Sequence, residues 1–216
     1  MKEDILEQLV EDWLQARGYF TRANLKFRPV DGSEGYDSKL DSVASDIDVI
    51  GIHPGKTGPE RVYVVNCKSW QDGFPISRIV RALRDKPDSL LNGKAHWKHF
   101  RELANPRWTR AFWQALQVVS HCGDEFTYVT AVTFARDPQN KREWTESPQF
   151  KQALKGNPVK FLTLRDMLEE VIEKLGTTVE SSQFSRTLQL FNAANIHLKL
   201  TPETSPPKAS RKSAQA

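Results

Sequence analysis

Two pairs of polar residues lie on two neighbouring runs of β-forming residues. Asp46 and Asp48 are separated by a single residue, and so are Asn66 and Lys68. Side chains at alternate positions of a strand point to the same face of a sheet. The spacing therefore predicts that each pair points to one face, with two carboxylates on the first strand and an amide and an ammonium group on the second.

The segment between the two runs, PGKTGPE, predicts a turn because it holds two prolines and two glycines. An antiparallel hairpin with His53 facing Arg61 puts Asp48 opposite Asn66, and the other aspartate opposite the lysine. Opposed side chains begin about 4.5–5.5 Å apart. This register predicts a polar cluster at one end of two otherwise apolar strands.

Carboxylates beside an ammonium group can support hydrolysis of phosphate esters when they bind a divalent cation. Carboxylate oxygens bind a hard cation such as Mg²⁺, which keeps several waters and shares its shell with a substrate phosphate. The cation lowers the pKa of a bound water, and a nearby ammonium group can orient that water or stabilise the developing charge. The alternative interpretation is a cross-strand ion pair between Asp46 and Lys68, which would contribute little to stability.

The elements around this hairpin predict a mixed α/β domain. Apolar residues at helical spacing predict helices, and runs of β-branched and aromatic residues predict strands. The segment 72–107 is rich in proline and basic residues and is expected to be irregular. The predicted helices cover 4–17, 108–120, 165–175 and 185–195, and the predicted extended segments cover 19–30, 45–53, 61–70, 126–134 and 159–164.

The pattern DIDVIGI, a short turn and VVNCKSW resembles the core of the PD-(D/E)XK nucleases, the restriction-endonuclease-like superfamily. In that superfamily an aspartate on one strand is followed, on the next strand, by an acid-x-lysine triplet. Asp48 matches the aspartate, Cys67 the middle position and Lys68 the lysine. The segment LEQLVEDWLQARGY also resembles the opening helix of Mrr-like and Holliday-junction-resolvase-like members, and Glu7 matches a glutamate that often faces their site.

The resemblance implies Mg²⁺-dependent hydrolysis of DNA phosphodiester bonds, with Mn²⁺ as a substitute cation. Asn66 stands where the superfamily has an acid or sometimes glutamine, and an amide oxygen can ligate a cation but brings no charge. Restoring the charge with Asn66→Glu is therefore expected to tighten metal binding and raise cleavage. The implied metal ligands are Asp48, Asp46, Asn66 and the carbonyl oxygen of Cys67, and the implied catalytic groups are Asp48, Lys68, Asp46 and Glu7.

The resemblance also implies the architecture. The expected fold is a restriction-endonuclease-like α/β domain over 1–200, with a mixed central sheet flanked by helices. Its αβββαβ core covers about 4–135, and a helical C-terminal extension covers about 136–200. The tail, 201–216, has no apolar residue except alanine and is expected to be disordered. The resemblance allows a homodimer or a larger DNA-processing complex.

A basic segment runs from Arg78 to Arg110. It holds nine basic residues against three acids, a local balance of +6 that leaves −2 for the rest of a chain with net charge +4. Such a segment is typical of a phosphate-binding face, and a solvated charged surface is the alternative. Interleaved aromatic residues could stack on unpaired bases. The candidate nucleic-acid-binding residues are Arg78, Arg81, Lys94, Lys98, Arg101, Arg107 and Arg110.

Composition excludes several classes of protein. No run of about 18 apolar residues exists, so a membrane span is not expected. The N-terminal apolar stretch carries acids throughout, which is unlike a secretion signal and favours the cytoplasm. Two cysteines cannot form a disulfide framework or a four-ligand zinc site. The alternative function is a non-catalytic nucleic-acid-binding protein or complex subunit, and RNA remains an alternative target because nothing in the sequence reads a 2′-hydroxyl.

Overall fold

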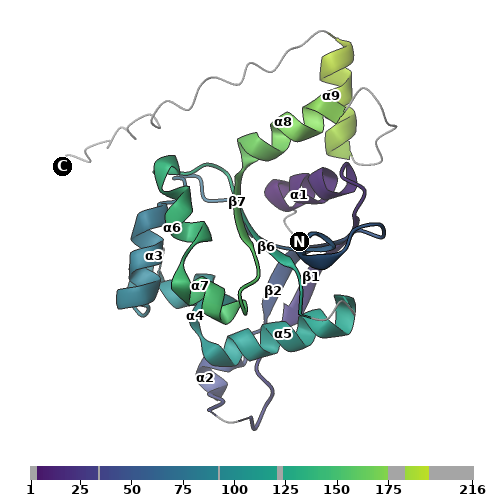
Figure 1. Ribbon diagram of the computed structural model, residues 1–216. Coiled ribbons are helices and arrows are strands. Elements are labelled where there is room, and N and C mark those ends of the chain that lie inside the picture. Colours follow the sequence, from purple (N-terminus) through teal and green to yellow (C-terminus); the bar gives the residue numbers. More distant parts are fainter. Residues whose placement is uncertain (1–3, 34, 92, 121–123, 175–182, 195–216) are drawn as a thin grey trace, which may run out of the picture.

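A mixed five-stranded sheet forms the centre of the protein in the computed structural model (Figure 1). The structure describes residues 4–33, 35–91, 93–120, 124–174 and 183–194. The strand order is β1-β2-β3-β6-β7; the first three strands are antiparallel, and β3, β6 and β7 are parallel. The predicted α/β class and mixed sheet are confirmed. The strands are β1 (Phe20–Phe27), β2 (Ser45–Ile52), β3 (Val62–Lys68), β6 (Thr127–Val132) and β7 (Val159–Thr163).

Helices cover both faces of this sheet, and each face has its own apolar core. One core lies under α1 (Ile5–Gln15), α8 (Leu164–Lys174) and α9 (Gln183–Ala193). The other core, which holds most of the buried aromatic side chains, lies under the remaining main helices. These are α3 (Ile76–Asp85), α4 (Arg101–Ala104), α5 (Pro106–Ser120), α6 (Lys141–Thr145) and α7 (Pro148–Ala153).

Helix α1 follows directly from its sequence. The carboxylate of Asp4 accepts a hydrogen bond from the backbone N–H of Leu6 at 2.9 Å and caps the helix. Gly18 takes a φ of 84°, which an L-residue rarely adopts, and turns the chain into β1. The apolar stripe of α1 is buried against the sheet, and Glu7 lies in its first turn.

The predicted hairpin register is confirmed for the apolar part of the two strands. Ile52 pairs with Val62 and Val49 pairs with Val65, as expected if His53 faces Arg61. The backbone N–H of His53 donates to the carbonyl oxygen of Arg61 at 2.8 Å. The β2–β3 pairing ends at Val49 and Val65, one position before the two polar pairs.

Strict side-chain alternation fails at Asp48, which corrects one premise of the sequence analysis. Ile47 and Ile50 pack into the same core although they are three residues apart. On the neighbouring strand β1, Asn24 lies opposite this point, takes a φ of 56° and is missing from the β1–β2 pairing. The irregularity shifts the residues before Asp48 to the opposite face from the one that the alternation predicted.

The segment 72–107 contains regular structure that the sequence analysis did not predict. It holds α3, a short hairpin of β4 (Leu90–Leu91) and β5 (Lys94–Ala95), the 3-10 helix η2 (His96–His99), and α4. The N-terminus of α3 is capped from far along the chain, since Asp137 accepts from the backbone N–H groups of Ile76 and Ser77 at 2.7 and 3.0 Å. A local pattern contains no sign of such a cap. Helices α6 and α7 were also missed.

The last three described elements agree with the predicted ranges. Strand β7 and helices α8 and α9 begin and end within two residues of the predicted bounds. The predicted disordered tail, 201–216, and Cys122 lie outside the described residues. Among the helices that the structure describes, none is long and apolar enough to cross a membrane.

Gly73 offers a test of the turn that leads from β3 towards α3. Its φ is 75°, and a Cβ atom there would lie 2.2 Å from Cε2 of Phe134. Gly32 has a similar φ of 78° but nothing within 4 Å of that position. Gly32→Ala should cost about 1–2 kcal/mol of unfolding free energy. Gly73→Ala should cost about 1–3 kcal/mol more because the methyl group meets the ring.

Urea denaturation of both variants measures the difference. Equal losses of stability would show that the Phe134 ring moves aside without cost.

Candidate functional site

Asp48 lies where β2 parts from β3 and is 9% exposed. Its Oδ2 accepts a hydrogen bond from the backbone N–H of Cys67 at 2.5 Å. Burial raises the pKa of Asp48 to about 6, against the opposing effects of the Lys68 charge and of the Cys67 hydrogen bond. The structure therefore brings Asp48 and Lys68 into one electrostatic cluster, as the register predicted.

Lys68 ends β3 and is half-buried. Its Nζ donates to the carbonyl oxygen of Cys67 at 3.0 Å and lies 5.3 Å from the centre of the Phe100 ring. The carbonyl that the resemblance assigns to a metal is thus the acceptor for the lysine. A cation–π contact holds the ammonium group at the edge of the sheet.

Asn66 is 7% exposed, and its two amide atoms differ in their contacts. Its Nδ2 donates to Oε1 of Glu102 at 3.3 Å. Its Oδ1 is buried and has no hydrogen-bond partner within the described part of the chain. A buried acceptor without a partner is uncommon and marks a place where a donor or a cation could be bound.

Glu102 is a residue of this site that the sequence analysis did not identify. It belongs to α4, is 3% exposed, and also accepts a short hydrogen bond from the hydroxyl of Tyr128 on β6. Burial raises the pKa of Glu102. In the sequence, Glu102 is only one of the three acids within the basic segment, and no local pattern distinguishes it from an exposed glutamate on a helix.

The register predicted that Asp46 lies opposite Lys68, and this prediction is wrong. The Oδ2 atom of Asp46 lies 2.6 Å from Nζ of Lys26, the residue that pairs with Asp46 on the neighbouring strand β1, and both side chains are partly exposed. The failure of alternation at Asp48 explains the change, since it turns Asp46 away from the face that Lys68 occupies. Asp46 still contributes negative charge to the cluster, because it acts on both Asp48 and Glu7.

Glu7 belongs to α1, which covers the face of the sheet opposite to that of α4 and Glu102. Partial burial raises the pKa of Glu7 to about 7, and the negative charge of Asp48 adds to this effect. Lys68 opposes the shift. The glutamate that the resemblance assigned to the site thus lies within electrostatic reach of its two central residues.

Cys67 is a buried residue whose thiol packs into the core under α1. Burial raises the pKa of this thiol well above its ordinary value. Such a thiol is a poor nucleophile. Cys67 is therefore a buried structural cysteine.

The oxygen donors of the cluster fit a hard cation in their chemistry. They are one buried carboxylate, one unpartnered amide oxygen and backbone carbonyl oxygen, the donor types that Mg²⁺ accepts alongside retained waters. Among the described residues, no three His, Cys, Asp or Glu side chains are grouped closely enough to hold a metal ion by themselves. Any cation here would depend on the amide and on water as well as on carboxylates.

Arg101 and Arg107, two of the seven basic candidates, have polar partners in other elements of the fold. Arg101 donates to the carbonyl oxygen of Val43 at 2.8 Å and stacks 4.1 Å over the Trp108 ring. Arg107 lies 3.2 Å from the fully buried carboxylate of Asp41. These contacts connect the segment before β2 to α4 and α5, so reversing the charges of the two arginines would perturb the fold as well as the binding of any ligand.

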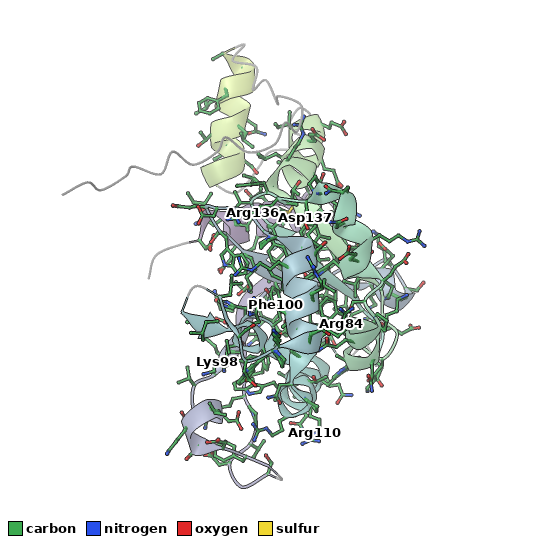
Figure 2. The ribbon with its side chains drawn as sticks, turned by 90° about the vertical axis from the view of Figure 1, so that its left-hand side faces the viewer. Arg84, Lys98, Phe100, Arg110, Arg136 and Asp137 are labelled. Carbon is green, nitrogen blue, oxygen red and sulfur yellow. The ribbon has the colours of Figure 1, made fainter. Side chains whose placement is uncertain are left out.

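The other basic candidates are more accessible. Figure 2 looks onto the face that carries α3, and it labels Arg84 of α3, Lys98 of η2 and Arg110 of α5. His99 of η2 lies close enough for the charges of Lys68 and Lys94 to lower its pKa, an effect secondary to burial. The η2 part of the segment therefore lies beside the candidate site. Arg78, Arg81, Lys94 and Arg110 are exposed, and Lys98 is half-exposed.

The aromatic residues within the basic segment and directly after it are core residues. Trp97, Phe100, Trp108, Phe112 and Trp113 are all at most 7% exposed. Of the two interpretations of these rings, stacking on unpaired bases and packing in the core, the structure supports the core. Their rings build the core under α3–α7, and the basic side chains extend from that layer.

Comparisons of the chain with protein-family models, with curated proteins and with solved structures found no match.

The raised pKa of Glu7 predicts a pH-dependent penalty on folding. Glu7 titrates at about 7 in the folded protein and at about 4.5 ordinarily, so its ionised form destabilises the fold as pH rises through this window. Glu7→Gln should therefore raise Tm at about pH 8 and leave Tm unchanged at about pH 4.

Thermal denaturation at both pH values provides the measurement. Glu173→Gln, which changes an exposed glutamate of α8, is the control and should leave Tm unchanged at either pH. An unchanged Tm for Glu7→Gln at the higher pH would contradict the assigned environment.

Proposed function

We propose that this protein is a metal-dependent nuclease of the PD-(D/E)XK type that hydrolyses phosphodiester bonds of DNA. The observation that carries the proposal is the junction between β2 and β3. There, Asp48 accepts from the Cys67 backbone beside Lys68, and the buried Oδ1 of Asn66 has no partner among the described residues. With α2, α3, β4, β5 and α4 regarded as insertions, the order α1-β1-β2-β3-α5-β6 agrees with the αβββαβ core of a restriction-endonuclease-like fold.

In the proposed site, Asp48, Asn66 and the Cys67 carbonyl hold Mg²⁺ or Mn²⁺, and Asp46 adds negative charge beside them. The bound cation would lower the pKa of a coordinated water and neutralise charge on the phosphate. Lys68 orients the attacking water and stabilises the charge that develops as the P–O bond breaks. Glu7 supports the cation or Lys68 from α1.

The basic segment supports DNA as the substrate. Its exposed lysine and arginine side chains can neutralise backbone phosphates, which requires no base-specific contact. The burial of its aromatic rings favours binding through the phosphate backbone over stacking on unpaired bases. RNA remains an alternative target because phosphate contacts are common to both nucleic acids.

The second candidate function is a nuclease-fold protein that binds nucleic acid without cutting it. The observation that favours it is the neutral amide at Asn66, together with the Lys68 ammonium group that occupies the Cys67 carbonyl oxygen. Such a protein would act as a binding subunit, either as a homodimer or within a larger DNA-processing complex.

Cleavage assays separate these two functions. Wild-type protein incubated with plasmid, single-stranded and branched DNA in Mg²⁺ or Mn²⁺ should cut at least one substrate. Lys68→Ala should lower the rate by about 10²–10³-fold through loss of charge stabilisation. Asp48→Asn should abolish cutting and leave DNA binding nearly intact, because removing a negative charge only reduces repulsion of phosphate.

The binding-subunit function is supported if wild-type protein binds DNA but leaves every substrate uncut with either Mg²⁺ or Mn²⁺. Residual cutting at the wild-type rate by Lys68→Ala would instead assign the activity to a contaminant or to another site.

A second experiment tests the basic face. Lys94→Glu with Lys98→Glu should weaken DNA binding and reduce the dependence of log Kd on log salt, because fewer counterions are released. Arg22→Glu with Arg61→Glu makes the same change in charge at the other end of the sheet and is the matched control. Fluorescence anisotropy with a labelled duplex at several salt concentrations gives both quantities.

If the two double variants weaken binding equally, the basic segment acts only through the net charge of the protein. A loss confined to the Lys94 and Lys98 variant locates the DNA-binding face beside η2.

A further inference from the structure

We propose that Glu102 is a positioning residue that supplies the carboxylate missing from β3 and sets which atom Asn66 presents to a cation. This inference rests on the proposed function, because it assumes that the site binds a divalent cation. It assigns the acid of the site to α4, outside the strand on which the acid-x-lysine pattern expects it.

The position of Glu102 is costly unless its charge is used. The side chain is 3% exposed, and no lysine, arginine or histidine in the described part of the chain lies within ion-pair distance of it. Burying a carboxylate without a paired cation costs several kcal/mol, which an apolar residue of similar volume would avoid. A cation bound to the amide oxygen of Asn66 would attract the Glu102 carboxylate, which contacts the same amide, and would offset this cost.

Glu102 also dictates the orientation of the Asn66 amide. An ionised carboxylate only accepts hydrogen bonds, so Asn66 must turn Nδ2 towards Glu102 Oε1. The amide oxygen is then left on the other side of the group, where it has no partner among the described residues. With an uncharged hydrogen-bonding residue at position 102, the amide could rotate and offer its NH₂ group to the site instead.

Tyr128 holds Glu102 in this position. Its hydroxyl donates to the same Oε1 that receives Asn66, and it extends from β6, the parallel neighbour of β3. The carboxylate is therefore fixed by two donors from adjacent strands. Apolar side chains of Ile47, Val64 and Phe112 line the same crevice as Asn66, Glu102 and Tyr128, so the charge of Glu102 acts on Asn66 in a surrounding of low dielectric constant.

This arrangement changes the expectation for the acid-x-lysine pattern. A carboxylate placed at position 66 would lie against the carboxylate of Glu102, and two such groups in a buried contact repel each other. Asn66→Glu is therefore expected to destabilise the site instead of completing it. The charge can be moved onto β3 only if position 102 becomes neutral at the same time.

The test transfers the negative charge from position 102 to position 66, the two positions joined by the hydrogen bond. Binding of Mn²⁺ by the intact protein is measured by calorimetry without DNA, and DNA cleavage is measured separately. Glu102→Gln removes the charge and should weaken Mn²⁺ binding by about 10–100-fold. The double variant Asn66→Asp with Glu102→Gln restores an acid–amide pair with reversed roles and should recover most of the lost affinity.

Glu60→Gln is the matched control, because Glu60 also accepts from a tyrosine, Tyr63, but lies at the opposite end of β3. It should leave Mn²⁺ affinity unchanged. Thermal denaturation checks that each variant folds, and if Glu102→Gln does not fold, the double variant is compared directly with wild type.

The outcomes separate this inference from the proposed function. Wild-type Mn²⁺ affinity in Glu102→Gln, or a double variant that binds no better than Glu102→Gln, would mean that Glu102 only packs the core. If Glu102→Gln is unfolded, loss of Mn²⁺ binding in the folded double variant has the same meaning. A wild-type protein that neither binds Mn²⁺ nor cuts DNA overturns the proposed function and this inference together.

Discussion

The hydrogen bond from the Cys67 backbone to the Asp48 carboxylate is the constraint on which the candidate site depends. The β2–β3 pairing ends at Val49 and Val65, and the next buried N–H of β3 would have no backbone acceptor. A buried N–H without an acceptor is costly, and the side chain of Asp48 supplies the missing oxygen. The strands can therefore part at this point, which leaves the edge of β3 open to side chains from α1 and α4.

The open edge gathers more negative than positive charge. Five acids contribute there, namely Asp4, Glu7, Asp46, Asp48 and Glu102, and the cations beside them include Lys68 and the Lys26 that pairs with Asp46. Burial and mutual repulsion raise the pKa values of Glu7 and Asp48 to about 7 and about 6. The fold thus holds its acids in an arrangement that costs stability, as is common at functional sites.

Local patterns predicted the parts of the fold that local forces decide. The apolar stripe of α1 and the turn-forming segment between β2 and β3 established the first helix and the hairpin register. The sequence could not reveal features that depend on distant partners. Asp137 caps α3 from 60 residues away along the chain, and Glu102 reaches Asn66 from another layer. The irregularity at Asp48, opposite Asn24 on β1, reversed the face of Asp46, and no local pattern indicates the tertiary contacts of Arg101 and Arg107.

The parallel pairing of β3 with β6 has a consequence for the order of folding. Tyr63 pairs with Thr127, which lies 64 positions further along the chain, whereas β2 and β3 are joined directly by the turn at 53–61. Closing a long loop is entropically expensive and slow, and local hairpins form much earlier. Asp48, Asn66 and Lys68 can therefore come together in the early hairpin. The donor from Tyr128 arrives only when β6 docks, so the polar cluster reaches its final form late in the assembly of the sheet.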